Sequence, residues 1–391
     1  MNGVLPLLFL LLPVAAFSGW VLGRRRSERT SGARVNELST SYFRGLNYLL
    51  NEQQDKAIEV FLKLAEINRD TVETHLALGN LFRRRGEVDR AIRVHQNLIA
   101  RQNLSDEEKT VALLELGEDY MRAGLLDRAE TLFSDLVAMD ALAPSALQHL
   151  IGIYQHERDW HKAIEHARRL EQAAGEPQAT TIAQFHCELA EQARGQGDRE
   201  GARAHVADAF AVQGDCVRAC MILGHLNSAD NELDAAIEAF ERVAELDPDY
   251  LPEILSPLLD CYARAQHMQR AEEFLLRMTE RHRGVTPVLA LARLYASTRG
   301  EAKAVEFLTL SLRQRPSLRA LMALVDMNLR TVQGEVRENF LTLRDLTAQL
   351  VEGKALYRCN RCGFGAKAHH WQCPSCKTWG SVRPVHGAAS E

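Results

Sequence analysis

The sequence has few aromatic residues, few prolines and no large excess of charge of one sign. Phe, Trp and Tyr make up 6% of its 391 residues, and there are 11 prolines. β-Sandwiches and barrels need many strands rich in aromatic and β-branched residues, so this composition favours a helical protein. The formal net charge is −5, which gives the chain as a whole no electrostatic reason to bind nucleic acid.

The chain also lacks the residue sets that enzymes use. No stretch combines a nucleophile, a general base and an oxyanion site. His156 and His161 are five residues apart, about 140° around a helix, whereas the histidines of a zinc protease helix are four residues apart. We therefore predict that the protein is not an enzyme.

Charged side chains are absent from residues 1–23, where Val4–Leu22 is almost wholly apolar. A helix over this run would be roughly 29 Å long, enough for the hydrocarbon core of a bilayer. Arg24, Arg25 and Arg26 follow directly, whereas a cleaved signal peptide carries its positive charge before the apolar run. A buried core helix would not be apolar on every side. The pattern predicts an uncleaved single-pass anchor, with the rest of the chain in the cytoplasm.

Beyond the anchor, the sequence repeats itself with a period near 34 residues. In His75–Leu98, two amphipathic segments flank a turn, and Ala91 marks the second segment. The residue twelve before the marker alanine is small in six of eight copies, and the residue nine before it is aromatic in six. This pattern resembles the tetratricopeptide repeat, a helix pair that buries its apolar faces by stacking on copies of itself. Unrelated helices would not keep the phase. The marker alanines are Ala57, Ala91, Ala129, Ala163, Ala202, Ala236, Ala271 and Ala304.

The first helix of each pair is expected to line a concave face where partners bind. Within one pair, Gly79 should face Ala91 so that the two backbones approach closely, with Phe82 beside them. The carboxylate clamp of some repeat proteins needs a lysine four residues before an asparagine, but Leu76 is the residue at that distance from Asn80. We predict instead an extended partner contact that uses Asn80, Arg83 and Arg84.

Cysteines occur in two groups with different spacing. Cys187, Cys216, Cys220 and Cys261 lie within the repeats, where we expect small buried thiols in a reducing compartment. The other four form two knuckles, Cys359-x-x-Cys362 and Cys373-x-x-Cys376, with ten residues between them. Such a pair of knuckles supplies a closed tetrahedral shell of four thiolates for iron or zinc. Two disulfides are the alternative, and a cytoplasmic location disfavours them.

These signals together predict an all-α protein: a tetratricopeptide-repeat solenoid with an N-terminal transmembrane helix and a small C-terminal rubredoxin-like metal ribbon with four cysteine ligands. The predicted division is an anchor at 1–23, a juxtamembrane linker at 24–37, a repeat array at 38–352 and the metal-binding domain at 353–391. The array comprises eight clear repeats and a degenerate ninth, formed by Ser317–Leu329 and Glu335–Val351.

The combination resembles a known family. LLFLLLPVAA before GRRR, then NYLLNEQQDKAIEVF, HLALGNLFRRRGEVDRAI, YRCNRCGF and HWQCPSC, are similar to the lipopolysaccharide assembly protein B family over essentially the whole chain. The resemblance implies an inner-membrane adaptor of Gram-negative bacteria, with a periplasmic N-terminus. It would promote degradation of the lipid A pathway deacetylase by the membrane protease FtsH, and so limit lipopolysaccharide synthesis. The implied metal ligands are Cys359, Cys362, Cys373 and Cys376, and other lipopolysaccharide assembly proteins are implied partners.

Two other functions remain possible from the sequence. A rubredoxin-like ligand set can hold an iron that cycles one electron, although no flavin or dinucleotide motif accompanies it. From residue 353 onward there are six Lys and Arg residues and one acid, a basic excess that could bind nucleic acid, acidic protein or lipid head groups. The alternative is that this excess offsets the negative charge of a divalent metal with four thiolates and leaves a mildly basic surface. The acidic chain as a whole argues against nucleic acid, and we predict no nucleic-acid partner.

Overall fold

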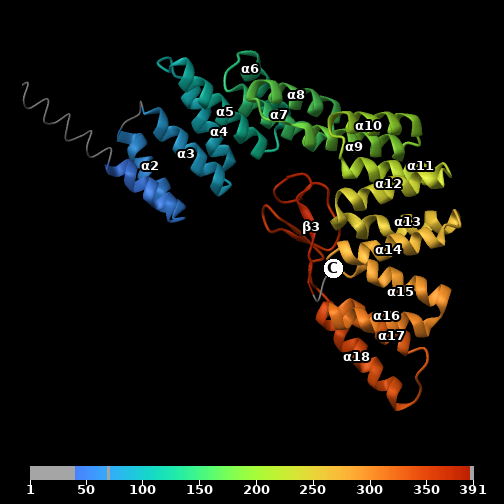
Figure 1. The fold of residues 1–391 in the computed structure, drawn as a ribbon. Helices are drawn as coiled ribbons and strands as arrows, with labels where there is room; N and C mark the ends of the chain where they lie inside the picture. Colours follow the sequence, from blue (N-terminus) through green and yellow to red (C-terminus); the bar gives the residue numbers. More distant parts are fainter. Residues whose placement is uncertain (1–39, 68–70, 388–391) are drawn as a thin grey trace, which may run out of the picture. The chain divides into compact units, whose positions relative to one another are not determined.

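The computed structural model describes residues 40–67 and 71–387, which fall into two compact units, the first ending at Glu176 and the second beginning at Pro177. The first unit consists of helices packed in consecutive pairs (Figure 1). Residues 40–50 form a helix that precedes α2. The helices that follow are α2 (Gln54–Ile67), α3 (Val72–Arg85), α4 (Val88–Ile99), α5 (Asp106–Arg122), α6 (Leu126–Ala138), α7 (Ala143–Glu157) and α8 (Trp160–Ala174).

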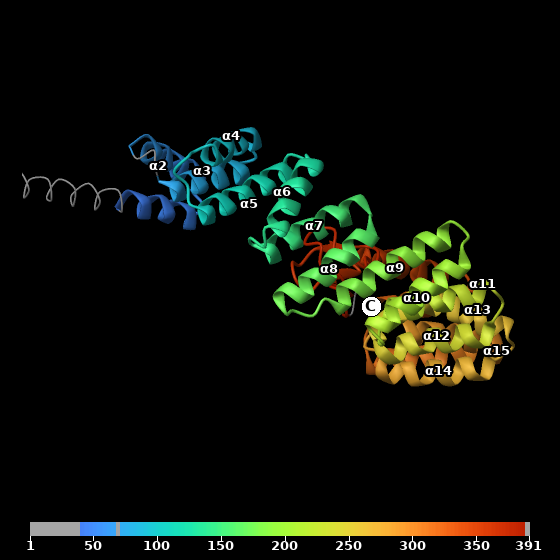
Figure 2. The ribbon, with the colours of Figure 1, turned by 90° about the horizontal axis from the view of Figure 1, so that it is seen from above.

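The second unit also consists of helix pairs, which Figures 1 and 2 show from two sides, and it ends in the small strand domain labelled β3 in Figure 1. Its helices are α9 (Ala179–Gly195), α10 (Arg199–Val212), α11 (Val217–Ala229), α12 (Leu233–Leu246), α13 (Leu251–Arg264), α14 (Met268–Arg281), α15 (Thr286–Arg299), α16 (Glu301–Gln314), α17 (Leu318–Asn328) and α18 (Glu335–Val351), with a 3-10 turn, η1 (Pro248–Tyr250), between α12 and α13.

Local sequence signals explain where helices begin and end. Ser105 caps α5 through a capping box, in which its hydroxyl accepts from the Glu108 N–H and the Glu108 carboxylate accepts from the Ser105 N–H. Gly86 ends α3 with a φ of 87°, a conformation that only glycine adopts without strain. This turn lets α4 fold back on α3.

The repeat register predicted from the sequence is confirmed. All eight marker alanines are fully buried. The predicted contact between Gly79 and Ala91 is not the tightest one, however: a Cβ at Gly79 would lie 2.3 Å from the His95 ring. The same arrangement recurs at Gly117, against Phe133, and at Gly224, against Phe240. The small residue therefore makes room for a ring four residues after the marker alanine.

The C-terminal strand domain is a three-stranded antiparallel sheet in the order β2-β1-β3. Its strands are β1 (Tyr357–Cys359), β2 (Gly365–Ala366) and β3 (Val382–Pro384). Cys359, Cys373 and Val382 form its small buried core, so the cysteines occupy the positions that apolar residues fill in a larger domain.

The predicted anchor and linker, residues 1–37, lie outside the described residues. Within residues 40–67 and 71–387, no helix is both long and apolar enough to cross a membrane.

Candidate metal centre and the surface that holds it

The two predicted cysteine knuckles come together at one point. The ligand atoms of Cys359, Cys362, Cys373 and Cys376 all lie within 4.8 Å of one another. The sulfur atoms of Cys359 and Cys376 are 3.7 Å apart, as are those of Cys362 and Cys373. All four are free thiols, so the alternative of two disulfides is not realised.

These distances fit a tetrahedral metal ion. With metal–sulfur bonds of about 2.3 Å, the sulfur atoms of a regular tetrahedron are about 3.8 Å apart. The two knuckles also have the same backbone: the Gly363 N–H donates to the Cys359 carbonyl and the Lys377 N–H donates to the Cys373 carbonyl. Gly363 and Lys377 both have a positive φ. The ribbon is therefore shaped to hold one metal ion in a closed shell of four thiolates, and such a shell leaves no site for an activated water.

Hydroxyl groups beside the sulfurs favour the thiolate forms. The Ser381 hydroxyl lies 3.3 Å from the Cys359 sulfur and lowers the pKa of this thiol to about 6. Thr378 similarly lowers the pKa of Cys376, while burial raises the pKa of Cys373 to about 11. A metal ligand must be deprotonated, so two of the four thiols are prepared for binding by their own surroundings.

The ribbon docks on the second unit through aromatic rings. Trp371 stacks on Tyr250 with ring centroids 5.0 Å apart and an interplanar angle of 13°. Trp379 meets Phe185 of α9 edge to face at 6.0 Å. The guanidinium of Arg218, a residue only 6% exposed, lies 5.4 Å from the Trp371 ring and 5.9 Å from the Trp379 ring. Arg218 is in turn held by Glu188 at 2.8 Å.

A second set of contacts joins basic ribbon residues to the acidic turn around η1. Arg383 pairs with Asp247, and His386 lies 3.0 Å from Asp249. The Tyr357 hydroxyl donates to Glu253, at the start of α13. Docking thus combines ring contacts that exclude water with charge pairs that fix the orientation.

The lead between the last predicted helix and the first ribbon cysteine is short, only Glu352–Arg358, which predicts that the ribbon packs on the repeats. The candidate contacts are its four aromatic residues, Tyr357, Phe364, Trp371 and Trp379, and three of them make such contacts. Tyr357, Trp371 and Trp379 touch the repeats. Phe364 instead packs on the ribbon core around Cys359. Their partners on the repeats had no sequence signal, because Arg218 and Tyr250 precede the ribbon by more than a hundred residues.

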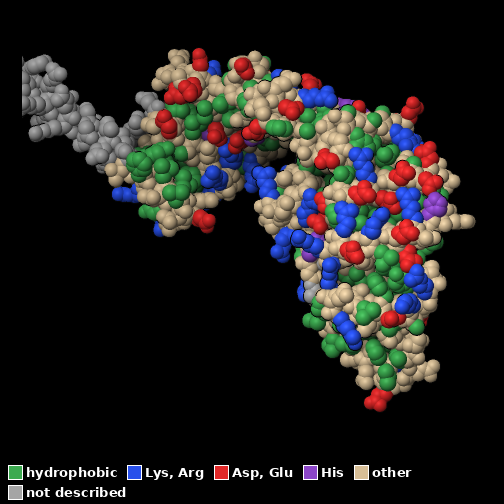
Figure 3. Space-filling model, in the orientation of Figure 1, with side chains coloured by type: hydrophobic (Ala, Val, Ile, Leu, Met, Phe, Trp, Pro, Cys, Tyr) green, Lys and Arg blue, Asp and Glu red, His purple; other side chains and the backbone are tan. Residues whose placement is uncertain are grey.

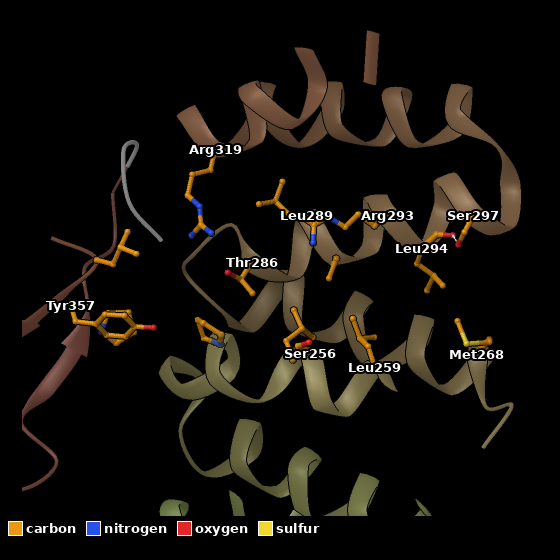
Figure 4. Close-up of a pocket in the computed structure, with 15 residues that line it drawn as sticks. Ser256, Leu259, Met268, Thr286, Leu289, Arg293, Leu294, Ser297, Arg319 and Tyr357 are labelled. Atoms are coloured by element: carbon orange, nitrogen blue, oxygen red, sulfur yellow. Dashed lines mark hydrogen bonds between the residues drawn. The ribbon is translucent and has the colours of Figure 1, made fainter. Parts of the chain in front are cut away.

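A cavity of about 600 Å³ lies where the ribbon meets α13 and α15 (Figure 4). Leu259 and Leu289 line its apolar side, while Arg293 and Arg319 supply positive charge and Tyr357 contributes from the ribbon. Among the described residues, none of the side chains that line this cavity is acidic. Its chemistry suits a partner segment with an apolar side chain and a nearby carboxylate.

The predicted partner-binding residues lie on α3 in the first unit. Arg83 is already engaged by acids of α5: Glu115 at 2.7 Å, Glu118 at 2.8 Å and Asp119 at 2.9 Å. The Asn80 amide donates to Glu115. We call Arg83, Glu115, Glu118, Asp119 and His95 the α3–α5 network, because His95 lies 2.5 Å from Asp119 and both are fully buried. Arg84 is exposed and lines a groove with Arg122 and His149.

The four cysteines within the repeats are buried and free, as the sequence predicts. The sulfurs of Cys187 and Cys216 are 3.8 Å apart, and a hydrogen bond between them lowers the pKa of Cys216 to about 7. None of these thiols lies in the ribbon.

Comparisons with known proteins agree with this description. A family of rubredoxin metal binding domains matches residues 357–384, and tetratricopeptide-repeat families match residues 74–108, 114–177 and 187–250. Lipopolysaccharide assembly protein B of Escherichia coli K12 is 39% identical over 385 residues, covering 98% of this chain and 99% of the relative. The protein of the same name from Haemophilus influenzae is 35% identical over 391 residues, covering 98% of each chain.

Among solved structures, the C-terminal part of a repeat protein from Cytophaga hutchinsonii is 14% identical, with a TM-score of 0.41, over 68% of this chain and 98% of that one. A score this low carries no inference about function.

Proposed function

The chain belongs to the lipopolysaccharide assembly protein B family, and from this membership we propose that it is an inner-membrane adaptor in the control of lipopolysaccharide synthesis. In this role it presents the lipid A pathway deacetylase to the protease FtsH and so promotes degradation of the deacetylase. The apolar, uncharged residues 1–23 would hold it in the membrane with its N-terminus in the periplasm, and the repeats would lie in the cytoplasm beside both partners. Confinement to one surface raises the effective concentration of the partners without a new contact.

The domain division supports an adaptor rather than an enzyme. We propose an anchor at 1–23, a linker at 24–37, stacked repeats at 38–352 and a metal ribbon at 353–391. Repeats offer an extended surface for protein partners. The ribbon's four thiolates would close the coordination shell, which suits a structural role.

The structural observation that supports this proposal is the docking of the ribbon on the repeats. A domain of fewer than forty residues has too small a core to fold by apolar burial alone, so a metal held by Cys359, Cys362, Cys373 and Cys376 would supply much of its folding free energy. The folded ribbon then forms one wall of the cavity beside α13 and α15. Metal binding would therefore complete a partner surface.

The test replaces Cys359 and Cys362 by serine in the full chain at its native expression level. We expect the metal to be lost, the ribbon to become protease-sensitive and the deacetylase to accumulate, while the repeats stay folded. Ser375→Ala is the matched control, because this exposed residue lies within the second knuckle and is not a ligand. Normal deacetylase turnover in a cysteine variant shown to lack metal would contradict the proposal.

A second experiment tests the predicted contact on α3. Arg83 is unsuitable for charge reversal, because an acidic residue at this position would set a carboxylate against three acids of α5 and perturb the fold itself. Arg84→Glu is the better probe, since Arg84 is exposed. We expect weaker partner binding with an unchanged circular dichroism spectrum, and Arg93→Glu, on the second helix of the same repeat, should bind normally. Unaltered binding by the Arg84 variant would remove this residue from the partner site.

Electron transfer is the second candidate function. One observation favours it: the Cys362 side chain is exposed, so an iron held there would have a thiolate route to solvent. Visible absorption of the purified chain distinguishes iron from zinc, because only an iron–thiolate centre is coloured. Replacement of iron by zinc without loss of deacetylase control would reject the redox function.

A further inference from the structure

A second cluster of metal-ligating side chains lies in the repeats, apart from the cysteine ribbon. His186 belongs to α9, and His205 and Asp208 lie three residues apart on α10. One ligand atom from each of the three residues lies within 4.8 Å of the other two. The two helices are the antiparallel pair of a single repeat, so the repeat itself brings the three side chains together.

We propose that His186, His205 and Asp208 form a second divalent-metal site, with two imidazole ligands and one carboxylate ligand. Imidazole and carboxylate donors suit zinc and the neighbouring first-row divalent ions. The cluster therefore differs in chemistry from the four-thiolate ribbon.

The distances support metal ligation better than direct hydrogen bonding. The Nδ1 atoms of His186 and His205 lie 3.7 Å and 3.8 Å from Oδ2 of Asp208, beyond the 2.7–3.2 Å of an ordinary N–H···O bond. Two ligand atoms on a tetrahedral zinc ion, each about 2.1 Å from the metal, are about 3.4 Å apart. Side-chain movements of a few tenths of an ångström would bring the carboxylate oxygen to that separation from each nitrogen, and the two ring nitrogens already lie within 4.8 Å of each other.

Burial and charge also fit an ion that enters from solvent. The side chains of His186, His205 and Asp208 are 9%, 26% and 58% exposed, so the cluster is closed at its base and open at the carboxylate. In the described part of the chain, the ion pairs of Asp208 are with these two histidines and with no lysine or arginine. A divalent cation would thus meet a carboxylate whose charge is not already neutralised by a fixed cation.

The site would cross-link α9 to α10 beside the surface that holds the ribbon. Phe185, the residue before His186, contacts Trp379 of the ribbon. Glu188, also on α9, holds Arg218 under the two ribbon tryptophans. A metal cross-link would therefore stiffen the helix on which the ribbon rests.

The test counts metal equivalents in the full chain, purified without a histidine tag and with the ribbon already loaded with zinc. Zn²⁺ is titrated in competition with a coloured chelator. We expect a second equivalent in the wild type, weakened more than ~10-fold in His205→Gln and in Asp208→Asn. Both substitutions alter side chains that are at least partly exposed, and circular dichroism verifies the fold. The second equivalent should also raise the melting temperature of the wild type but of neither variant, because the ion binds only the folded repeat.

A matched control comes from His267 and Asp234, a histidine–carboxylate pair 3.4 Å apart without a second histidine partner in the described ion pairs. His267→Ala should keep the second equivalent. Co²⁺ gives an independent measurement, because only the ribbon should show sulfur-to-cobalt charge transfer. Three results would overturn the proposal: a wild type that binds a single equivalent, a site variant that binds the second equivalent as tightly as the wild type, or loss of the second equivalent in His267→Ala.

Discussion

Trp371 is the ring whose removal should undock the ribbon without unfolding it. The residue lies outside the four-cysteine cluster, and its ring faces the repeats, between Tyr250 and Arg218. In Trp371→Ala, the metal and its knuckles would remain while the principal contact with the repeats is lost. The variant therefore separates docking from ribbon folding.

The cost can be worked out from the contacts. Loss of the stacked pair with Tyr250 costs about 1 kcal/mol. Loss of the cation–π contact with the buried Arg218 costs about 1 kcal/mol more. Apolar area returned to water adds a comparable amount for a ring that is only partly buried. The total of about 3 kcal/mol corresponds to a roughly 100-fold shift of the docking equilibrium toward the released state.

Limited proteolysis of the segment between α18 and the ribbon, residues 352–356, measures this shift. Where opening and closing are fast relative to cleavage, the cleavage rate follows the population of the open state, so it should rise about 100-fold while the metal content stays constant. Lys367→Ala is the control, since this ribbon side chain is exposed. Equal cleavage rates in wild type and Trp371→Ala, or loss of metal in the variant, would refute the reasoning.

Three further perturbations test other parts of the structure. Burial lowers the pKa of His369 to about 4, so between pH 6.5 and pH 4 the unfolded ribbon binds a proton that the folded ribbon does not. The free energy of unfolding of the ribbon should therefore fall by about 1 kcal/mol per pH unit as the pH drops through this range. His369→Phe should flatten this slope in acid-unfolding curves. Gly224→Ala would set a Cβ 2.6 Å from the Phe240 ring and should cost about 1–3 kcal/mol by thermal unfolding, whereas Gly214→Ala, with its nearest neighbour at 4.0 Å, should cost much less. Asp119→Asn would remove the carboxylate that accepts from Arg83 and lies against the buried His95, and weaker hydrogen bonds there should cost about 1–3 kcal/mol in denaturant unfolding; a loss below about 0.5 kcal/mol would show that these contacts contribute little.

The repeats could be predicted because their signal is local and recurs. The alanine phase alone located the second helix of each pair, and the marker alanines are fully buried. The residue that Gly79 faces could not be predicted from this local signal, because the contact depends on the relative rotation of α3 and α4. His95 fills the place of the phenylalanine found in other repeats, and its partner Asp119 lies on the next helix pair.

The four metal ligands were likewise predicted from the spacing of the cysteines. Of the docking contact, only the ribbon side could be predicted, and the surface of the repeats that receives the ribbon could not. The short lead before the ribbon predicts that the ribbon packs on the repeats, and Trp371 and Trp379 are among the predicted contacts. The surface that receives them is assembled from α9, α11 and η1, which lie far from the ribbon in the sequence. Such long-range contacts leave no periodic pattern in a single sequence. The partner role of Arg84 stays a prediction.

The basic excess of the C-terminal segment gains a physical meaning from this docking. From the sequence, six Lys and Arg residues against one acid suggested nucleic acid, lipid head groups or acidic protein as partners. The structure provides an acidic partner within the chain: the turn around η1 presents Asp247 and Asp249 to Arg383 and His386. Figure 3 also shows Lys and Arg side chains on the face of the ribbon that is turned toward the viewer. The basic residues of the ribbon are therefore divided between two roles: Arg383 and His386 pair with the acids of the η1 turn and help to orient the ribbon on the repeats, whereas Lys367 stays exposed and adds positive charge to the ribbon surface.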